Sequence, residues 1–240
     1  MGIKISLTTI PERIDKIEKT INSLLSQDLN ADIYLYIPIQ SLRSKVKFNV
    51  NKIPEFLKNV KIKIIIKDND IGSIMKMFYC LKEYPEDYII VADDDVIYPT
   101  NWASTLYKNA IINKDKNLPI CFRGRNFTTP DINYKKTKVV NCNIIKKSTS
   151  VSIITGTWGA IYKKDMFPNE FFDFKVGLFS RIDDIWITGM LWKNKKKGIV
   201  IPFKGIIKPT EVANINSLWQ KNSTGTYNNQ GLDEFKKYHF

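Results

Sequence analysis

A short apolar run that ends in three consecutive aspartates constrains this chain more than any other feature. Residues 88–92 read Tyr-Ile-Ile-Val-Ala, and Asp93, Asp94 and Asp95 follow without a polar spacer. Such a run is typical of a parallel strand buried on both faces, and open α/β sheets bind ligands at the carboxyl ends of their strands. Three adjacent carboxylates repel one another, and a divalent cation is their natural partner. The alternative is a solvated acidic turn.

The remainder of the first half predicts strands that alternate with helices. The expected strands span residues 3–9, 33–37 and 60–66, and the expected helices start near residue 11 and span 74–81 and 102–112. This alternation implies right-handed crossovers and a mainly parallel sheet flanked by helices, which is an α/β fold.

The second half is less regular. It predicts strands at residues 120–123, 151–155, 160–162 and 199–203, a basic loop at 128–138, and a helix at 183–193. The chain has 240 residues, which suits one α/β domain. We therefore expect a single domain over residues 1–240, with a nucleotide-binding half at 1–115 and an acceptor-binding half at 116–240.

Composition narrows the class of protein and its compartment. Hydrophobic residues make up 43% of the chain, which is too many for a disordered protein. The formal net charge of +13 attracts polyanions without choosing among nucleic acid, anionic lipid and nucleotide phosphates. Three widely spaced cysteines predict reduced thiols in a cytoplasmic protein and argue against a zinc site. We recognise no signal peptide and no apolar run long enough to span a membrane.

Four segments together resemble a known family. They read SLTTIPER at residues 6–13, SLLSQ at 23–27, ADDDVIYP at 92–99 and DDIW at 183–186. In this order and at these spacings the chain resembles bacterial glycosyltransferases of the GT-A fold, similar to the GT2 class, that build capsule, lipopolysaccharide or other surface glycans. The resemblance runs over most of residues 3–230 and implies a Rossmann-like, mainly parallel sheet with a less regular acceptor-binding second half.

The resemblance implies a nucleoside-diphosphate-sugar donor held through Mn²⁺ or Mg²⁺. The sugar, most simply a hexose, would move to a hydroxyl of a glycan or lipid-linked oligosaccharide. Asp93, Asp94 and Asp95 match the family's Asp-x-Asp element. On that match Asp95 is the direct metal ligand. Asp93 lies nearer the ribose or sugar and is the second candidate ligand, and Asp94 assists either of them.

The same resemblance assigns donor contacts at the end of the first strand. Thr8, Thr9 and Arg13 match positions that hold the base or ribose, although Thr9 could instead cap a helix. Lys76 follows a Gly-containing loop and could reach a phosphate or pair with the acids, although a surface lysine is the plain alternative.

A small-residue turn, Gly-Thr-Trp-Gly at residues 156–159, resembles the family's border of the donor sugar. Trp158 could stack on a sugar face, since aromatic rings offer a flat apolar surface. The alternative is a hairpin turn with a tryptophan in the core.

A second acidic pair, Asp183 and Asp184, opens the predicted helix at 183–193. The helix dipole stabilises carboxylates at this end and explains one of them as a cap. In inverting members of the family an acid here is the base for the acceptor hydroxyl, and Asp184 is the first choice, followed by Asp183. His239, the sole histidine, is a weaker candidate for the metal because it is the penultimate residue.

Two other function classes stay open at this stage. The basic charge suits a nucleic-acid-binding or processing protein, but the chain has no recognised nucleic-acid-binding motif, so we expect no nucleic-acid partner. The third class is a non-catalytic nucleotide- or glycan-binding module of the same fold. A lysine cluster at positions 193, 195, 196 and 197 could also hold the protein against an anionic membrane, although a solvated surface explains it equally well.

Overall fold

The main sheet runs through both halves of the chain. The computed structural model describes residues 2–58, 60–218 and 225–240. Within them the strand order of the main sheet is β3-β2-β1-β4-β11-β6-β12-β9. The strands are β1 (Ile3–Thr8), β2 (Asp32–Pro38), β3 (Ile62–Lys67), β4 (Tyr88–Ala92), β6 (Ile120–Cys121), β9 (Thr149–Val151), β11 (Ala160–Tyr162) and β12 (Gly198–Val200). The predicted α/β fold, a mainly parallel sheet flanked by helices, is confirmed.

A strand near the middle of this sheet runs in the opposite direction to its two neighbours. Strands β3, β2, β1 and β4 are parallel neighbours, and β6 is parallel to β12. Strand β11 lies between β4 and β6 and is antiparallel to both. The turn that leads into β11 therefore lies at the edge of the sheet where β4 ends.

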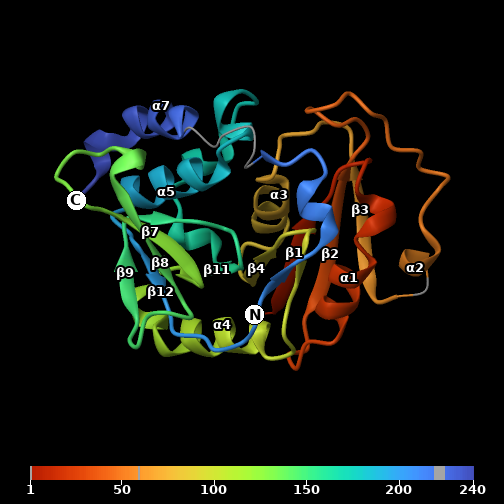
Figure 1. Cartoon of the computed structure of the whole chain (residues 1–240), viewed down its shortest axis with the longest axis horizontal. Helices are drawn as coiled ribbons and strands as arrows, with labels where there is room; N and C mark the ends of the chain where they lie inside the picture. Colours follow the sequence, from red (N-terminus) through yellow and green to blue (C-terminus); the bar gives the residue numbers. More distant parts are fainter. Residues whose placement is uncertain (1, 59, 219–224) are drawn as a thin grey trace.

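The helices form where the apolar spacing predicts them, with two additions. They are α1 (Glu18–Leu25), α2 (Glu55–Lys58), α3 (Met75–Glu83), α4 (Trp102–Ile112), α5 (Asp183–Lys193) and α7 (Thr226–Phe235). In Figure 1, α1 and α2 lie beside strands β1 to β3, and α5 and α7 lie over the opposite half of the molecule. Helix α5 is buried from residue 185 to residue 192 because α7 packs against one side of it and residues 153–154 against another.

Two small sheets complete the fold. One has the order β10-β7-β8, with β10 (Ile153–Ile154), β7 (Arg123–Phe127) and β8 (Thr137–Asn141). The other pairs β5 (Val96–Ile97) with β13 (Lys208–Pro209). Because β5 directly follows the three aspartates, this pairing brings the segment after residue 207 beside them, and the Thr210 amide donates to the Asp95 carbonyl at 2.8 Å.

Several local predictions were wrong in instructive ways. The helix expected from residue 11 begins as a 3-10 turn (Ile14–Lys16), and α1 proper starts at Glu18. The strand expected at 120–123 is two strands, β6 and β7, that belong to different sheets. The loop expected at 128–138 ends in β8, which pairs with β7 as an antiparallel hairpin. Helices α2 and α7 were not predicted.

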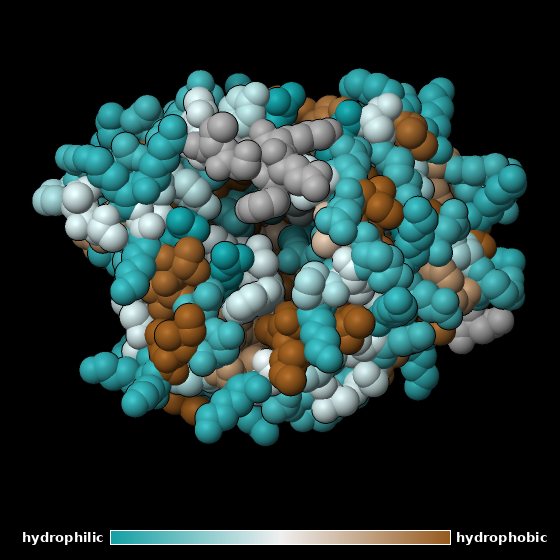
Figure 2. All heavy atoms as spheres, viewed as in Figure 1, coloured by the Kyte–Doolittle hydropathy of each residue, from teal (hydrophilic) through white to brown (hydrophobic). Residues whose placement is uncertain are grey.

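The face shown in Figure 2 is mainly polar, with scattered apolar patches. All three cysteines are buried free thiols, Cys80, Cys121 and Cys142. Across the described residues, every helix is too short or too polar to cross a bilayer.

Candidate active site

A cavity of 820 Å³ opens between the first-half strand ends and the second half. The three aspartates after β4, the residues after β1 and Lys76 of α3 line one side. The turn at 156–159, the start of α5 and strand β7 line the other. Figure 2 shows that this face of the molecule is hollowed near its middle. The first-half candidates, the turn and the second acidic pair therefore meet in one space.

Asp94 is the most enclosed of the three acids. Its Oδ1 lies 2.6 Å from Arg13 Nη1, and its Oδ2 accepts a hydrogen bond of 2.6 Å from the Thr9 hydroxyl. The Thr20 hydroxyl of α1 donates to the Asp94 carbonyl at 3.1 Å. Both carboxylate oxygens are thus occupied by protein groups. Thr9 serves Asp94 instead of capping the helix that follows.

Asp93 is held by a buried lysine. Lys76 Nζ lies 2.6 Å from Asp93 Oδ1, with the lysine side chain only 8% exposed. Burial lowers the pKa of Lys76, but the negative charges of Asp93 and then Asp183 raise that pKa by more. The net shift of the pKa is upward, so the lysine stays charged. The Asp93 amide also donates to the Tyr98 hydroxyl at 2.8 Å. Lys76 is therefore not a surface lysine.

Asp95 has the freest carboxylate of the run. It is 24% exposed, and its nearest cation is Arg13 Nη1 at 3.3 Å, which is a longer contact than the one Asp94 receives. Burial, followed by repulsion from Asp93 and Asp94, raises the pKa of Asp95 to about 6. The raised pKa means that too little positive charge lies near this carboxylate to offset burial and its two acidic neighbours. A cation bound beside it would lower the pKa again.

Hydrogen bonds within the turn and from Trp102 hold the turn at 156–159 in place. The Gly159 amide donates to the Gly156 carbonyl at 3.0 Å, and the indole Nε1 of Trp102 donates to the Trp158 carbonyl at 2.7 Å. Gly159 has a φ of +107°, and a Cβ there would lie 2.5 Å from the Trp102 ring. Trp158 itself has a φ of +76°, is partly exposed and lines the cavity. The turn joins strands of two different sheets, so it is not a hairpin, and its tryptophan is not in the core.

The second acidic pair faces the same cavity from α5. The Gly156 amide donates to Asp184 Oδ1 at 2.7 Å, which ties α5 to the turn. Burial, followed by the charge of Asp183, raises the pKa of Asp184 to about 7. Asp183 also lines the cavity, on the side where its charge acts on Lys76. Asp184 is thus oriented by the backbone and can hold or release a proton near neutral pH.

Few side chains in the cavity could coordinate a metal ion. Within the described ranges no group of three or more His, Cys, Asp or Glu side chains is arranged to hold an ion. Since Asp94 is fully engaged, Asp95 and Asp93 are the carboxylates that can reach one. Mg²⁺ is commonly bound through one or two carboxylates together with substrate phosphates and water. The site therefore fits a cation that arrives with a phosphate-bearing ligand.

Sequence reasoning missed most of the arginines of the site. Arg43, Arg123, Arg125 and Arg181 line the cavity together with Arg13. Apart from Arg123 and Arg125 on β7, they lie far apart in the chain, and they match no motif. Their common signal is composition, since these are the only five arginines of 240 residues. Thr8, which was predicted, also lines the cavity, where its hydroxyl donates to the Tyr36 carbonyl at 2.9 Å.

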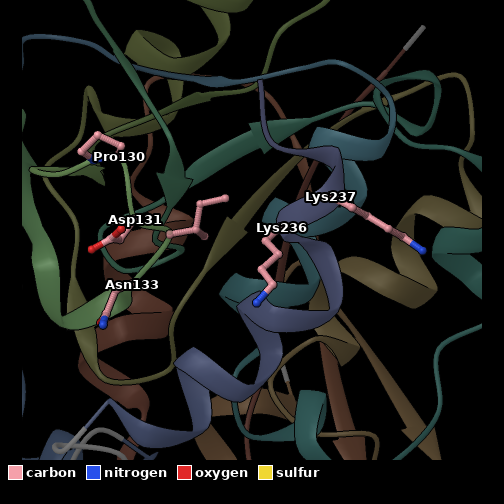
Figure 3. Close-up of a pocket in the computed structure, with 6 residues that line it drawn as sticks. Pro130, Asp131, Asn133, Lys236 and Lys237 are labelled. Carbon is pink, nitrogen blue, oxygen red and sulfur yellow. The ribbon is translucent and has the colours of Figure 1, made fainter.

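Two other features lie away from this cavity. The His239 ring packs against Trp192 and Phe127, with ring centroids 4.7 and 5.3 Å apart, and it does not line the cavity. A second hollow of 530 Å³ lies between residues 130–133 and the lysines after α7 (Figure 3). Of its charged groups, Asp131 pairs with Lys136 and Lys236 pairs with Asp233, while Lys237 Nζ lies 5.1 Å from the centre of the Tyr238 ring.

Comparisons with known proteins support the fold. No protein-family model matches the chain, and no curated protein sequence matches it. A crystal structure of residues 1–349 of S. aureus TarS aligns with 100% of this chain and 72% of that chain, at 13% identity and a TM-score of 0.51. Structures of the same segment in complex with UDP and with UDP-GlcNAc align with 78% of this chain, at 13% identity and a TM-score of 0.45. In these two, this chain spans 56% and 54% of the other chain. The likeness to TarS 1–349 shows that this protein has a GT-A-like glycosyltransferase fold.

Proposed function

We propose that this protein is a metal-dependent glycosyltransferase that moves a sugar, most simply a hexose, from a nucleoside-diphosphate sugar to a hydroxyl of a glycan or lipid-linked acceptor. One observation carries the proposal. Two acidic groups, Asp93 to Asp95 and Asp183-Asp184, line the same cavity, and that cavity lies at the strand ends where open α/β folds bind ligands. A fold alone does not imply an activity, so we infer the activity from these side chains.

The donor would bind on the first-half side of the cavity. Asp95, with Asp93, would hold Mn²⁺ or Mg²⁺, which when bound neutralises the charge of the diphosphate. Arg13 and Thr9 fix Asp94 and so position the acidic run, while Thr8 lies where the base or ribose would bind. Lys76 holds the Asp93 carboxylate in place through their 2.6 Å contact. Trp158 offers a partly exposed ring to the sugar.

The acceptor would bind on the second-half side, near Asp184. In an inverting transfer, the acceptor oxygen forms a bond to the anomeric carbon as the bond from that carbon to the diphosphate breaks. The hydroxyl proton passes to the Asp184 carboxylate. A base works best when its pKa lies near the working pH, and the pKa of Asp184, raised to about 7, meets that condition. Asp183 is the second candidate for this role.

The acceptor class suggests a location for the protein. A lipid-linked acceptor would be reached from an anionic cytoplasmic membrane face, and basic side chains are attracted to such a surface. Lys193 is paired with Glu170 at 2.7 Å, so Lys195, Lys196 and Lys197 are the better candidates for this contact. Sedimentation with phosphatidylserine vesicles at low salt should carry the protein down, and phosphatidylcholine vesicles should not. Equal behaviour with both would remove the membrane part of the proposal.

A donor panel tests the proposed function directly. The full chain is incubated with nucleotide sugars and Mn²⁺ or Mg²⁺, and both thermal shift and donor hydrolysis are measured. UDP-GlcNAc is the first compound to try, because TarS has been crystallised with it. We expect at least one donor to stabilise the protein in the presence of metal and to lose that effect with EDTA. A panel in which no donor gives a metal-dependent response would contradict the proposal.

A further inference from the structure

All five arginines of the chain line the cavity. The chain has 37 lysines and arginines together, so lysine is by far its usual cation. Across the described residues, Lys76 is the one lysine among the lining side chains. A guanidinium differs from an ammonium in its planar, forked donors, which match a carboxylate or a phosphate in pairs. The distribution therefore indicates that the cavity needs this geometry as well as positive charge.

The five arginines divide by the side of the cavity they belong to. Arg13 is bound to the acidic run, and Arg43 donates to the Asn216 carbonyl at 2.9 Å. The remaining three, Arg123, Arg125 and Arg181, come from the second half, and we call them the arginine wall. Two of them alternate along β7 with Gly124, where a Cβ would lie 2.6 Å from the Val151 side chain. Since neighbouring residues of a strand face opposite sides, this alternation turns Arg123 and Arg125 to the same face.

The arginine wall lacks acidic partners. Over the described ranges, none of its three guanidinium groups lies within ion-pair distance of a carboxylate, whereas Arg13 has two such contacts. The stretches outside those ranges include no Asp or Glu. In addition, Arg123 Nε is buried without a hydrogen-bond partner. Arg123 and Arg125 are half-buried, and Arg181 is exposed. A buried cationic donor is costly unless an anion or acceptor meets it, so Arg123 lacks a partner that a ligand could supply.

Aromatic rings hold the wall in place. The Arg123 guanidinium carbon lies 5.5 Å from the Trp158 ring centre, that of Arg125 lies 4.8 Å from Tyr134, and that of Arg181 lies 5.6 Å from Tyr227. Arg125 Nε also donates to the Thr137 hydroxyl at 2.6 Å. Guanidinium groups that rest on rings are restrained while their remaining N–H groups stay available to a ligand.

The wall lies on the acceptor side of the site. The charge of Asp184 acts on both Arg123 and Tyr134, so the wall is close to the proposed base. The metal-binding acids lie on the other side, where Arg13 and Lys76 already supply positive charge. We propose that the acceptor carries an anionic group, a carboxylate or a phosphate, which Arg123, Arg125 and Arg181 bind beside the hydroxyl that receives the sugar. This inference rests on the proposed function, because it names the acceptor class of the same cavity.

Two matched pairs of probes test it, each differing only in charge. The carboxylate pair is a galacturonate trimer and its methyl ester. The phosphate pair is a phosphorylated mannose oligosaccharide and the same compound after phosphatase treatment. Binding of each to the full chain is measured by calorimetry with UDP and Mn²⁺ present. The variants are Arg123→Gln, Arg125→Gln and Arg125→Lys. Lys138→Gln is the control, because it removes one charge from an exposed position of β8, outside the cavity.

We expect wild type to bind one anionic probe at least about tenfold more tightly than its neutral partner, as charge-assisted hydrogen bonds allow. Whichever pair shows the preference identifies the anion as carboxylate or phosphate. Arg123→Gln and Arg125→Gln should lose the preference, and Arg125→Lys, which keeps the charge without the fork, should lose most of it. Lys138→Gln should keep it. The affinity for UDP should be the same in all the variants.

Three results would overturn the inference. The first is equal binding of charged and neutral probes by wild type. The second is a loss of UDP affinity in the arginine variants with the probe preference unchanged, which would assign the wall to the donor. The third is an equal loss in Lys138→Gln, which would reduce the effect to net charge. A wild type that responds to UDP and metal but fails the probe test leaves the proposed function standing, so the two failures are distinguishable.

Discussion

Arg13 Nη1 lies 2.6 Å from Asp94 Oδ1, and neither side chain is more than 8% exposed. This buried pair fastens the segment after β1 to the middle of the acidic run after β4. Breaking a buried pair from one side is destabilising because the other charge remains without a partner. The pair therefore supports the site without itself needing to touch a ligand.

The first prediction concerns the stability of this pair. Arg13→Met should lower the free energy of unfolding by about 3–5 kcal/mol, because Asp94 stays buried without its cationic partner. Asp94→Asn should cost less, because an amide oxygen still accepts from Thr9 and Arg13 keeps Asp95 at 3.3 Å. Urea denaturation of both variants measures the difference. An Asp94→Asn variant as unstable as Arg13→Met would contradict the argument.

The second prediction concerns the metal. Asp95→Asn should abolish the metal-dependent thermal shift with UDP, while its melting temperature without ligands stays near that of wild type. The reason is that Asp95 has the freest carboxylate of the three. Asp115→Asn, an exposed change away from the cavity, is the matched control. If Asp95→Asn keeps a full response to UDP and Mn²⁺, its assignment as the metal ligand is wrong.

The third prediction separates the two acids of α5. Asp184→Asn should lower kcat about 10²–10⁴-fold, the range of general base catalysis, with the donor KM little changed. Asp183→Asn should have a smaller effect, because its carboxylate is not oriented by the Gly156 amide. Steady-state kinetics on both variants checks this. A larger loss in Asp183→Asn would exchange their roles.

The fourth prediction concerns pH and stability. The pKa of Asp184 is about 7 in the folded protein, above its ordinary value of 3.8. Between these values the folded state binds more protons than the unfolded state, so this group contributes less stability as the pH rises from about 4 to 7. Asp184→Asn removes the effect. The stability of wild type relative to this variant should fall by on the order of 3–4 kcal/mol over that range, since one pKa unit corresponds to about 1.4 kcal/mol. Denaturation at several pH values measures it, and a difference independent of pH would refute it.

The sequence was sufficient where one signal dominated. The apolar run at 88–92 became β4, and the apolar pattern with acids at its start predicted α5 with its observed bounds, Asp183–Lys193. A pairing of Lys76 with the acids was one of the three possibilities for that residue, and the structure shows it with Asp93. These features depend on local periodicity and on which strand end an acid follows.

The features that were missed depend on tertiary contacts. Helix α7 has few apolar positions, and the residues it buries include Asn228 and Gly231, so its pattern is weak without α5 beside it. The reversed direction of β11 cannot be derived from three apolar residues, because periodicity is the same in either direction. The arginine wall needs the pairing of β7 with its neighbours before its members come together.

The antiparallel strand β11 also determines whether the first half of the chain can be soluble without the second half. Its residues pair with Ile89, Ile90 and Val91 along one edge of β4, so the second half supplies the cover for a strand of the first. A fragment cut at residue 115 would expose the backbone of that buried apolar strand as an open edge, which is a template for aggregation. The donor half should therefore be insoluble when produced alone. Co-expression of residues 116–240 with it should restore soluble protein.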